Sequence, residues 1–256
     1  MKIRQLAAIL LSIIMLFTLL TSCELQPTAE ELLLIASANM LANPYEMTID
    51  ISMSSDNKEV NDIMSMVNGT YSARVDGDNL EMTMAVAGVE VDYLLVDDVI
   101  YMNMYGLKVK MPVNTEQTDE LFGEIIGSFD GSVDGLGKLK DATMTSENGL
   151  TTITINGAGA LVNEAIEKFG DTLGDDVVIT ANEEKTSIVI VLDEDNFYKS
   201  MTMNMALEYS VEGLDEKVSV DLKYDYTFDF SEDFEIVAPD DADSYVSMDY
   251  DDIYGK

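Results

Sequence analysis

The sequence predicts a mainly β protein of the α+β class, built around one large antiparallel sheet. Apolar and polar residues alternate over long stretches, which is typical of strands with one buried and one solvated face. Turn sequences such as Asp76-Gly77-Asp78-Asn79 and Glu147-Asn148-Gly149 separate these stretches, as hairpins require. Only a few segments have the apolar spacing of a helix, so the sheet dominates the predicted fold.

The chain begins with the features of a secretory signal. Lys2 and Arg4 precede an uncharged apolar stretch, and Leu20-Thr21-Ser22-Cys23 resembles a bacterial lipobox. In that motif the cysteine receives a diacylglyceryl thioether and becomes the new N-terminus. We therefore expect a signal peptide over residues 1–22 and lipidation at Cys23, which anchors the protein at the extracytoplasmic face of a bacterial cell membrane. A plain signal peptide or an uncleaved anchor helix are the alternatives.

A lipidated tether, residues 23–27, precedes a predicted N-terminal helix. Thr28 and Glu31 have the spacing of a capping box, in which each side chain accepts a hydrogen bond from the other residue's backbone amide. The apolar residues continue to Leu41, and Asn43-Pro44 ends the helix.

From Tyr45 the apolar period changes to two, and the longest alternating stretches lie at 201–211 and 218–230. Because residues i and i+2 share one face of a strand, the alternation predicts a continuous apolar face. Methionines are frequent at its positions. The residues expected to contact a ligand there are Met47, Ile49, Ile51, Met53, Met82, Met84, Met201, Met203, Met205 and Leu207.

Two central segments, about 115–129 and about 159–170, have apolar residues at i, i+1, i+4, i+5 and i+8, which is one face of a helix. Their matching patterns predict a pair of helices on the same apolar surface. Glycines between them allow the pair to move as a lid. The predicted lid residues are Leu121, Phe122, Ile125, Ile126, Phe129, Leu161, Val162, Ile166 and Phe169.

The mature chain is predicted to hold one domain, residues 28–238, followed by an acidic C-terminal tail, residues 239–256. The tail has no periodic apolar pattern, so an extended edge and a loose tail both remain open. Its aspartates leave specific calcium binding as a weak alternative, because no calcium-loop motif is present.

Composition excludes several classes of function. The 49 Asp and Glu against 14 Lys and Arg give a formal charge of −35, so we expect no nucleic-acid partner. Histidine is absent and Cys23 is the one cysteine, which removes Ser/His and Cys/His nucleophiles, histidine-ligated metals and thiolate clusters. We expect a protein that is not an enzyme and has no cofactor or metal centre. A chain this acidic is also repelled by anionic lipid headgroups.

Residues 98–112, with the sequence DVIYMNMYGLKVKMP, resemble a hairpin common in LolA/LppX-like bacterial lipoproteins and lipid carriers. Val109 stands where those proteins often carry Trp. The order of lipobox, helix, strands, central helix pair and further strands is also similar to that family. The resemblance implies a curved half-barrel with the N-terminal helix and the two central helices in or over its concave face. It also implies that acyl chains are held there.

The 17 methionines bear on the predicted function. Methionine is flexible and polarizable, which suits a surface that accommodates variable apolar ligands, although the same residues can simply pack the sheet against its helices. We therefore expect a non-enzymatic protein that binds or shuttles an apolar or lipid ligand in a Met-rich concavity. The alternative is a structural or interaction module with a filled core and an acidic partner-binding face. The sequence identifies no protein partner.

Overall fold

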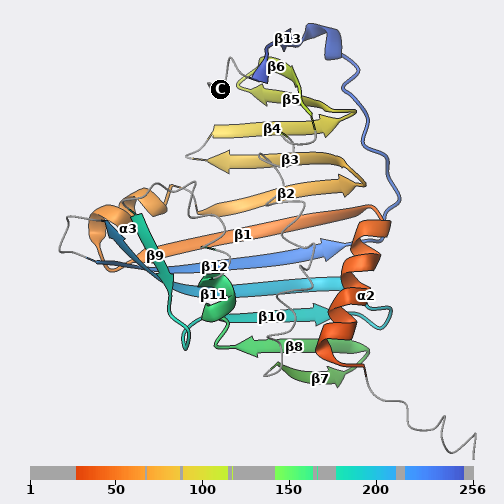
Figure 1. The fold of residues 1–256 in the computed structure, drawn as a ribbon. Helices are drawn as coiled ribbons and strands as arrows, with labels where there is room; N and C mark the ends of the chain where they lie inside the picture. The colour runs from red at the N-terminus through yellow and green to blue at the C-terminus, as the bar shows by residue number, and fades with distance from the viewer. Residues whose placement is uncertain are drawn as a thin grey trace, which may run out of the picture.

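The structure is a computed structural model, and it describes residues 27–66, 68–86, 89–114, 117, 142–163, 166, 177–211 and 217–250. The predicted signal peptide and the lipidation site Cys23 lie outside these residues. Six of the predicted lid residues also lie outside them: Leu121, Phe122, Ile125, Ile126, Phe129 and Phe169. Thirteen strands form one sheet in the described part of the chain (Figure 1).

The strands follow the chain in two antiparallel series. The first series holds β1 (Tyr45–Ser55), β2 (Gly69–Asp76), β3 (Asn79–Val86), β4 (Val89–Val96), β5 (Val99–Met104) and β6 (Leu107–Pro112). The second series holds β7 (Thr143–Glu147), β8 (Leu150–Asn156), β10 (Ser187–Leu192), β11 (Tyr198–Val211) and β12 (Val218–Asp229). Two short strands are added at the sides: β9 (Val177–Ala181) pairs with β11, and β13 (Val246–Ser247) pairs parallel to β6.

The two series meet in the middle of the sheet, where β1 pairs with β12 from Glu46 opposite Asp229 to Ser55 opposite Val220. The strand order is β13-β6-β5-β4-β3-β2-β1-β12-β11-β10-β8-β7. Within the described residues the outermost strands, β13 and β7, do not pair with each other, so the curved sheet stays open. The predicted class, a mainly β half-barrel with few helices, is confirmed.

Helix α2 (Ala29–Ala42) begins as the sequence predicts. The Glu31 amide donates to Thr28 Oγ1 at 3.2 Å, and the Thr28 amide donates to the Glu31 carboxylate at 2.8 Å, so the capping box is confirmed. The helix ends at Ala42, with Asn43 as its C-cap. It runs across one end of the sheet, over β12, β11, β10 and β8 (Figure 1).

Tight hairpins join neighbouring strands. Asn148 and Gly149 both have positive φ (54° and 78°), as does the pair Asp97 and Asp98 (51° and 60°), which is the backbone twist that two-residue hairpins favour. Tyr105-Gly106 makes the same turn between β5 and β6. The hairpin predicted within residues 98–112 is therefore confirmed as a structural element.

Helix α3 (Lys58–Met64) and strand β9 were not predicted, because each is too short to show a periodic apolar pattern. Helix α3 has a local start signal, since Asn57 Oδ1 accepts from the Glu59 and Val60 amides at 3.0 and 3.2 Å.

The described part of the C-terminal tail is an extended edge. A 3-10 turn, η2 (Ala242–Ser244), leads into β13, and the Met248 amide donates to the Lys110 carbonyl at 2.9 Å. Tyr250 is buried and belongs to the main hydrophobic core. The chain therefore returns to the domain after residue 239.

We predict that Thr28→Ala destabilises the protein by about 1 kcal/mol, because the substitution leaves the Glu31 amide of α2 without its side-chain acceptor. Thr28→Ser, which keeps the hydroxyl, is the matched control. Denaturant unfolding measures both variants. An alanine variant as stable as the serine variant would contradict the role of the capping box.

Candidate functional site

The candidate site is one face of the sheet, which we call the apolar face. It is the side that carries Met47, Ile49, Ile51 and Met53 of β1 together with the residues aligned with them on the neighbouring strands. Met47 lies opposite Phe228 and Ala73, and Ala73 lies opposite Met82. On the other side of β12 the aligned residues are Met201 opposite Tyr226, Met203 opposite Tyr224, Met205 opposite Leu222 and Leu207 opposite Val220. All ten predicted ligand-contacting residues therefore share this face.

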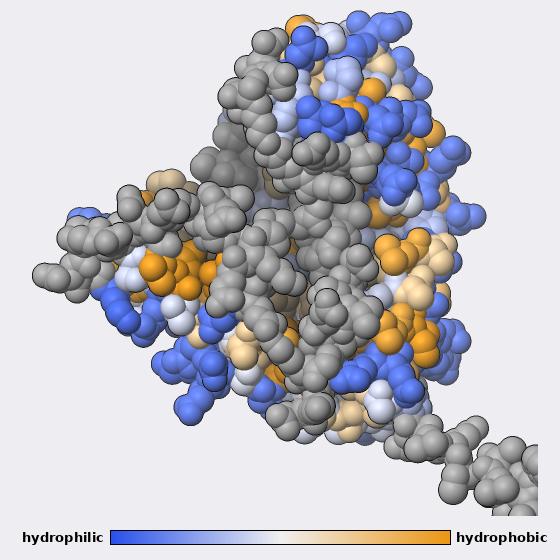
Figure 2. All heavy atoms as spheres, in the orientation of Figure 1, coloured by the Kyte–Doolittle hydropathy of each residue, from blue (hydrophilic) through white to orange (hydrophobic). Residues whose placement is uncertain are grey.

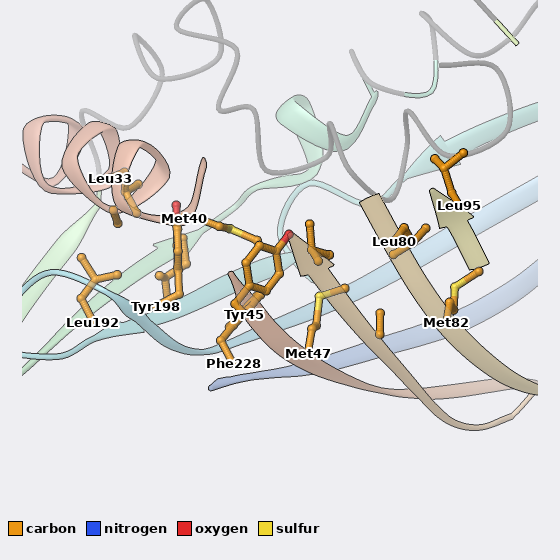
Figure 3. Close-up of a cluster of buried hydrophobic side chains, with 14 of the residues drawn as sticks. Leu33, Met40, Tyr45, Met47, Leu80, Met82, Leu95, Leu192, Tyr198 and Phe228 are labelled. Carbon is orange, nitrogen blue, oxygen red and sulfur yellow. The ribbon is translucent and has the colours of Figure 1, made fainter. Parts of the chain in front are cut away.

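Helix α2 closes one end of the apolar face. Its residues Leu33 and Met40 point toward Leu192, Tyr198 and Tyr45 (Figure 3). Tyr45 and Tyr198 lie beside Phe228, with ring centroids 6.3 and 5.6 Å away. The Tyr198 hydroxyl is 3.2 Å from the Ser37 hydroxyl of α2. This end of the sheet is a packed core, which we call the α2 cluster.

A second packed cluster lies at the opposite end of β11 and β12. Its buried residues are Ala181, Leu207 and Leu222, and Met53 and Met205 pack against them. Residues 159–163 are helical, as predicted for the second central helix. Val162 and Ile166 pack on this second cluster, whereas Leu161 packs on the α2 cluster. The segment therefore touches both ends of the apolar face.

Where the two clusters meet, the residues of the apolar face are half-buried: Ile49, Met201 and Tyr226 pack against the α2 cluster, and Tyr224 packs against the second cluster. We call this region the central band, and its residues are Ile49, Met201, Met203, Tyr224 and Tyr226. Tyr226 stacks between Tyr224 and Phe228, at centroid distances of 6.0 and 6.3 Å. Flexible methionine side chains thus lie beside a row of aromatic rings. Such a surface can adapt to an apolar molecule of variable shape.

Burial raises the pKa values of four tyrosines of the apolar face, so these four are neutral at physiological pH. Burial, with a smaller contribution from Tyr224, raises the pKa of Tyr226 to about 12. Burial also raises the pKa values of Tyr45, Tyr198 and Tyr209 above the ordinary value. The hydroxyls therefore add hydrogen-bonding capacity to the face without adding charge.

The ten residues predicted to contact a ligand differ in how deeply their side chains are buried. Met47, Met82 and Leu207 are 2, 5 and 6% exposed, so they belong to the packed core. The other seven are half-buried. The sequence-based selection of ligand-contacting residues omitted Tyr224, Tyr226, Tyr93 and Met102, which share the face. The alternation of these four residues with polar neighbours is the sequence signal that could have placed them on the apolar face.

The opposite side of the sheet is polar and acidic. Threonine hydroxyls donate to aspartates on neighbouring strands: Thr202 to Asp225 at 2.7 Å and Thr83 to Asp92 at 3.1 Å. Hydrogen bonds from Lys223 and Thr202 lower the pKa of Asp225, although burial opposes them. A shallow hollow is lined mostly by polar residues of this side, including Ser52, Lys185 and Asn204. Met205 and Leu222 also contribute to its lining.

Comparison with known proteins identifies no relative, since no family model and no curated protein sequence matches the chain. The LolA/LppX-like resemblance therefore stays a prediction. None of the helices in the described residues combines the length and hydropathy needed to span a membrane. Among the same residues, no three His, Cys, Asp or Glu side chains are grouped so that they could hold a metal ion.

We predict that Met47→Ala and Met203→Ala differ strongly in stability, although both remove a methionine from the same face. Met47 is buried, so its truncation costs about 2–5 kcal/mol through lost packing and a residual cavity. Met203 is half-buried in the central band, so its truncation costs less. Denaturant unfolding of the two variants tests this difference, and equal losses would show that the central band is packed as tightly as the α2 cluster.

A second prediction concerns alkaline pH. The folded-state pKa of Tyr226 lies above the ordinary value of 10, at about 12. The protonated Tyr226 hydroxyl makes its full contribution to the free energy of unfolding below pH 10. This contribution is lost as the pH rises through about 12. Tyr226→Phe cannot ionise, so its free energy of unfolding should fall less over that window than that of the wild-type protein. Identical pH slopes would contradict the burial of the Tyr226 hydroxyl.

Proposed function

We propose that this protein is a lipid-anchored, extracytoplasmic binding protein that holds an apolar ligand, such as a lipid acyl chain, against the central band. In this proposal the protein is not an enzyme, and the domain delivers or stores its ligand unchanged. Residues 1–22 direct secretion, and acylated Cys23 attaches the mature chain to the membrane.

The observation that carries the proposal is the uneven burial of one continuous apolar face. Fully buried residues lie toward both of its ends, whereas the residues of the central band, like Met53 and Met205 beside it, are half-buried, and most of them pack against the buried residues on either side. A protein that needs only stability gains from burying such residues completely, at roughly 25 cal/mol per Å² of apolar surface. Half-buried methionines and tyrosines in the middle of a sheet are therefore consistent with a surface that a ligand completes.

The size and chemistry of the central band favour a narrow apolar chain. Along β11 the band begins at Met201 and reaches the second cluster at Met205, four residues further on, which corresponds to about 13 Å along the strand. The methionines can follow a flexible ligand, and the neutral tyrosine hydroxyls can accept or donate a hydrogen bond at its polar end. Leu161, Val162 and Ile166 lie over the face, where the lid segment was predicted.

The alternative function is an interaction module with a filled core. The observation that favours it is the acidic polar side, where neighbouring hydroxyls and amides hold the carboxylates in place. One example is Asp92, which accepts hydrogen bonds from Thr83 and Asn103. A basic partner would bind this side through charge complementarity. The two functions place the binding surface on opposite faces of the same sheet.

Native mass spectrometry tests the leading proposal. We expect lipid to co-purify with the mature protein and to be released only on denaturation. Met203→Trp should fill the central band and weaken binding of a fluorescent fatty acid by about tenfold, which corresponds to 1.4 kcal/mol. Asn204→Trp is the matched control, because the adjacent residue on β11 lies on the polar side. A protein that carries no lipid and refuses added fatty acid would favour the interaction module.

The anchor has its own test. We expect Cys23→Ser to prevent acylation, because the thioether requires the sulfur atom. Intact-mass measurement reports the acyl chains, and fractionation reports location. If the wild-type chain carries no acyl group, the lipoprotein proposal is wrong, whatever the apolar face binds.

A further inference from the structure

Helix α2 has a second apolar side, which the fold does not use. Its inner side, with Leu32, Leu33, Ala36 and Met40, is buried against the sheet. Its outer side carries Leu34, Ile35 and Leu41, which are 42, 44 and 65% exposed. Figure 2 shows this apolar surface in orange where Figure 1 places α2. A helix that is apolar all round normally lies in a core, in an interface or against lipid.

The charge pattern around this outer side is unusual for so acidic a chain. No charged residue occurs between Glu31 and Glu46, so α2 is free of charge from its second turn to its end. Charged residues make up 25% of the whole sequence. The outer side of α2 is thus an uncharged apolar strip on a protein whose net charge is −35.

The position of α2 along the chain, close to Cys23, indicates which surface can contact this strip. Helix α2 begins at Ala29, six residues after Cys23. Six residues span at most about 22 Å when fully extended. If Cys23 is acylated, as the proposed function states, α2 is therefore held within a short distance of the membrane surface. At such short range even a weak affinity gives high occupancy, because the tether sets a high effective concentration.

We propose that the outer side of α2 docks in the interface of the membrane that holds the acyl anchor, with Leu34, Ile35 and Leu41 inserted among the lipids. The docking orients the half-barrel on the membrane. Interfacial helices bind through buried apolar area, and the acyl anchor holds α2 at the surface against the repulsion between the acidic chain and anionic headgroups. Repulsion between acidic chains disfavours a second copy as the occupant of this strip.

A site-specific fluorophore tests the proposal. Acylated Cys23 has no free thiol, so Leu41→Cys creates a unique labelling position in the mature lipoprotein. Tyr105→Cys is the matched control, since Tyr105 is 79% exposed in the β5–β6 hairpin, far from α2 in the strand order. Both labelled chains are anchored in phosphatidylcholine vesicles with brominated acyl chains. We expect about a twofold loss of fluorescence at position 41 and none at position 105.

Leu34→Ser and Ile35→Ser, added to the Leu41→Cys chain, should remove the quenching. Because both residues face outward, the melting temperature of this variant should stay within a few degrees of that of the Leu41→Cys chain. Equal fluorescence at positions 41 and 105 in an acylated, anchored chain would overturn the docking alone. Shielding of position 41 without vesicles, increasing with protein concentration, would identify a second copy and also overturn it. A chain recovered without acyl groups would overturn both this proposal and the anchor on which it rests.

Discussion

The antiparallel pairing of β1 with β12 is the contact on which the rest of the structure depends. It joins the first long strand to the last, and every other strand is added outward from this pair. Because side chains alternate between faces, a shift of one residue in this register would turn Met47 and its neighbours to the polar side. The pairing therefore aligns Met47 with Phe228 and Met53 with Leu222, and so creates a single apolar face.

A one-sided sheet must be covered, and this one is covered unevenly. Helix α2 covers one end, and β9 with the segment around Val162 closes the other. The central band between them remains half-buried, although its residues are as apolar as those of the two clusters. Stability alone favours closing such a band, so its half-burial links the fold to the proposed ligand. The methionines there suit a surface whose occupant changes shape or leaves.

Charge is segregated in the same way as hydrophobicity. The carboxylates of the strands lie mainly on the polar side, where hydroxyls such as Thr202 donate to them and solvent screens their repulsion. The apolar face carries neutral tyrosines, and α2 carries no charge beyond its first turn. This separation leaves uncharged surfaces on an acidic domain, as the proposed ligand and membrane contacts require.

The sequence by itself determined the fold class, the capping box of α2, the face on which Met47 and Met203 lie, and several hairpins, because these features depend on period and local turn chemistry. It missed α3 and β9, which are too short for a period. Only the tertiary structure decided that Met47 is core and Met203 is half-buried, that Tyr226 stacks between Tyr224 and Phe228, and that Leu41 faces outward. Burial depends on what packs across a face, and that is set by strand order and register between distant segments.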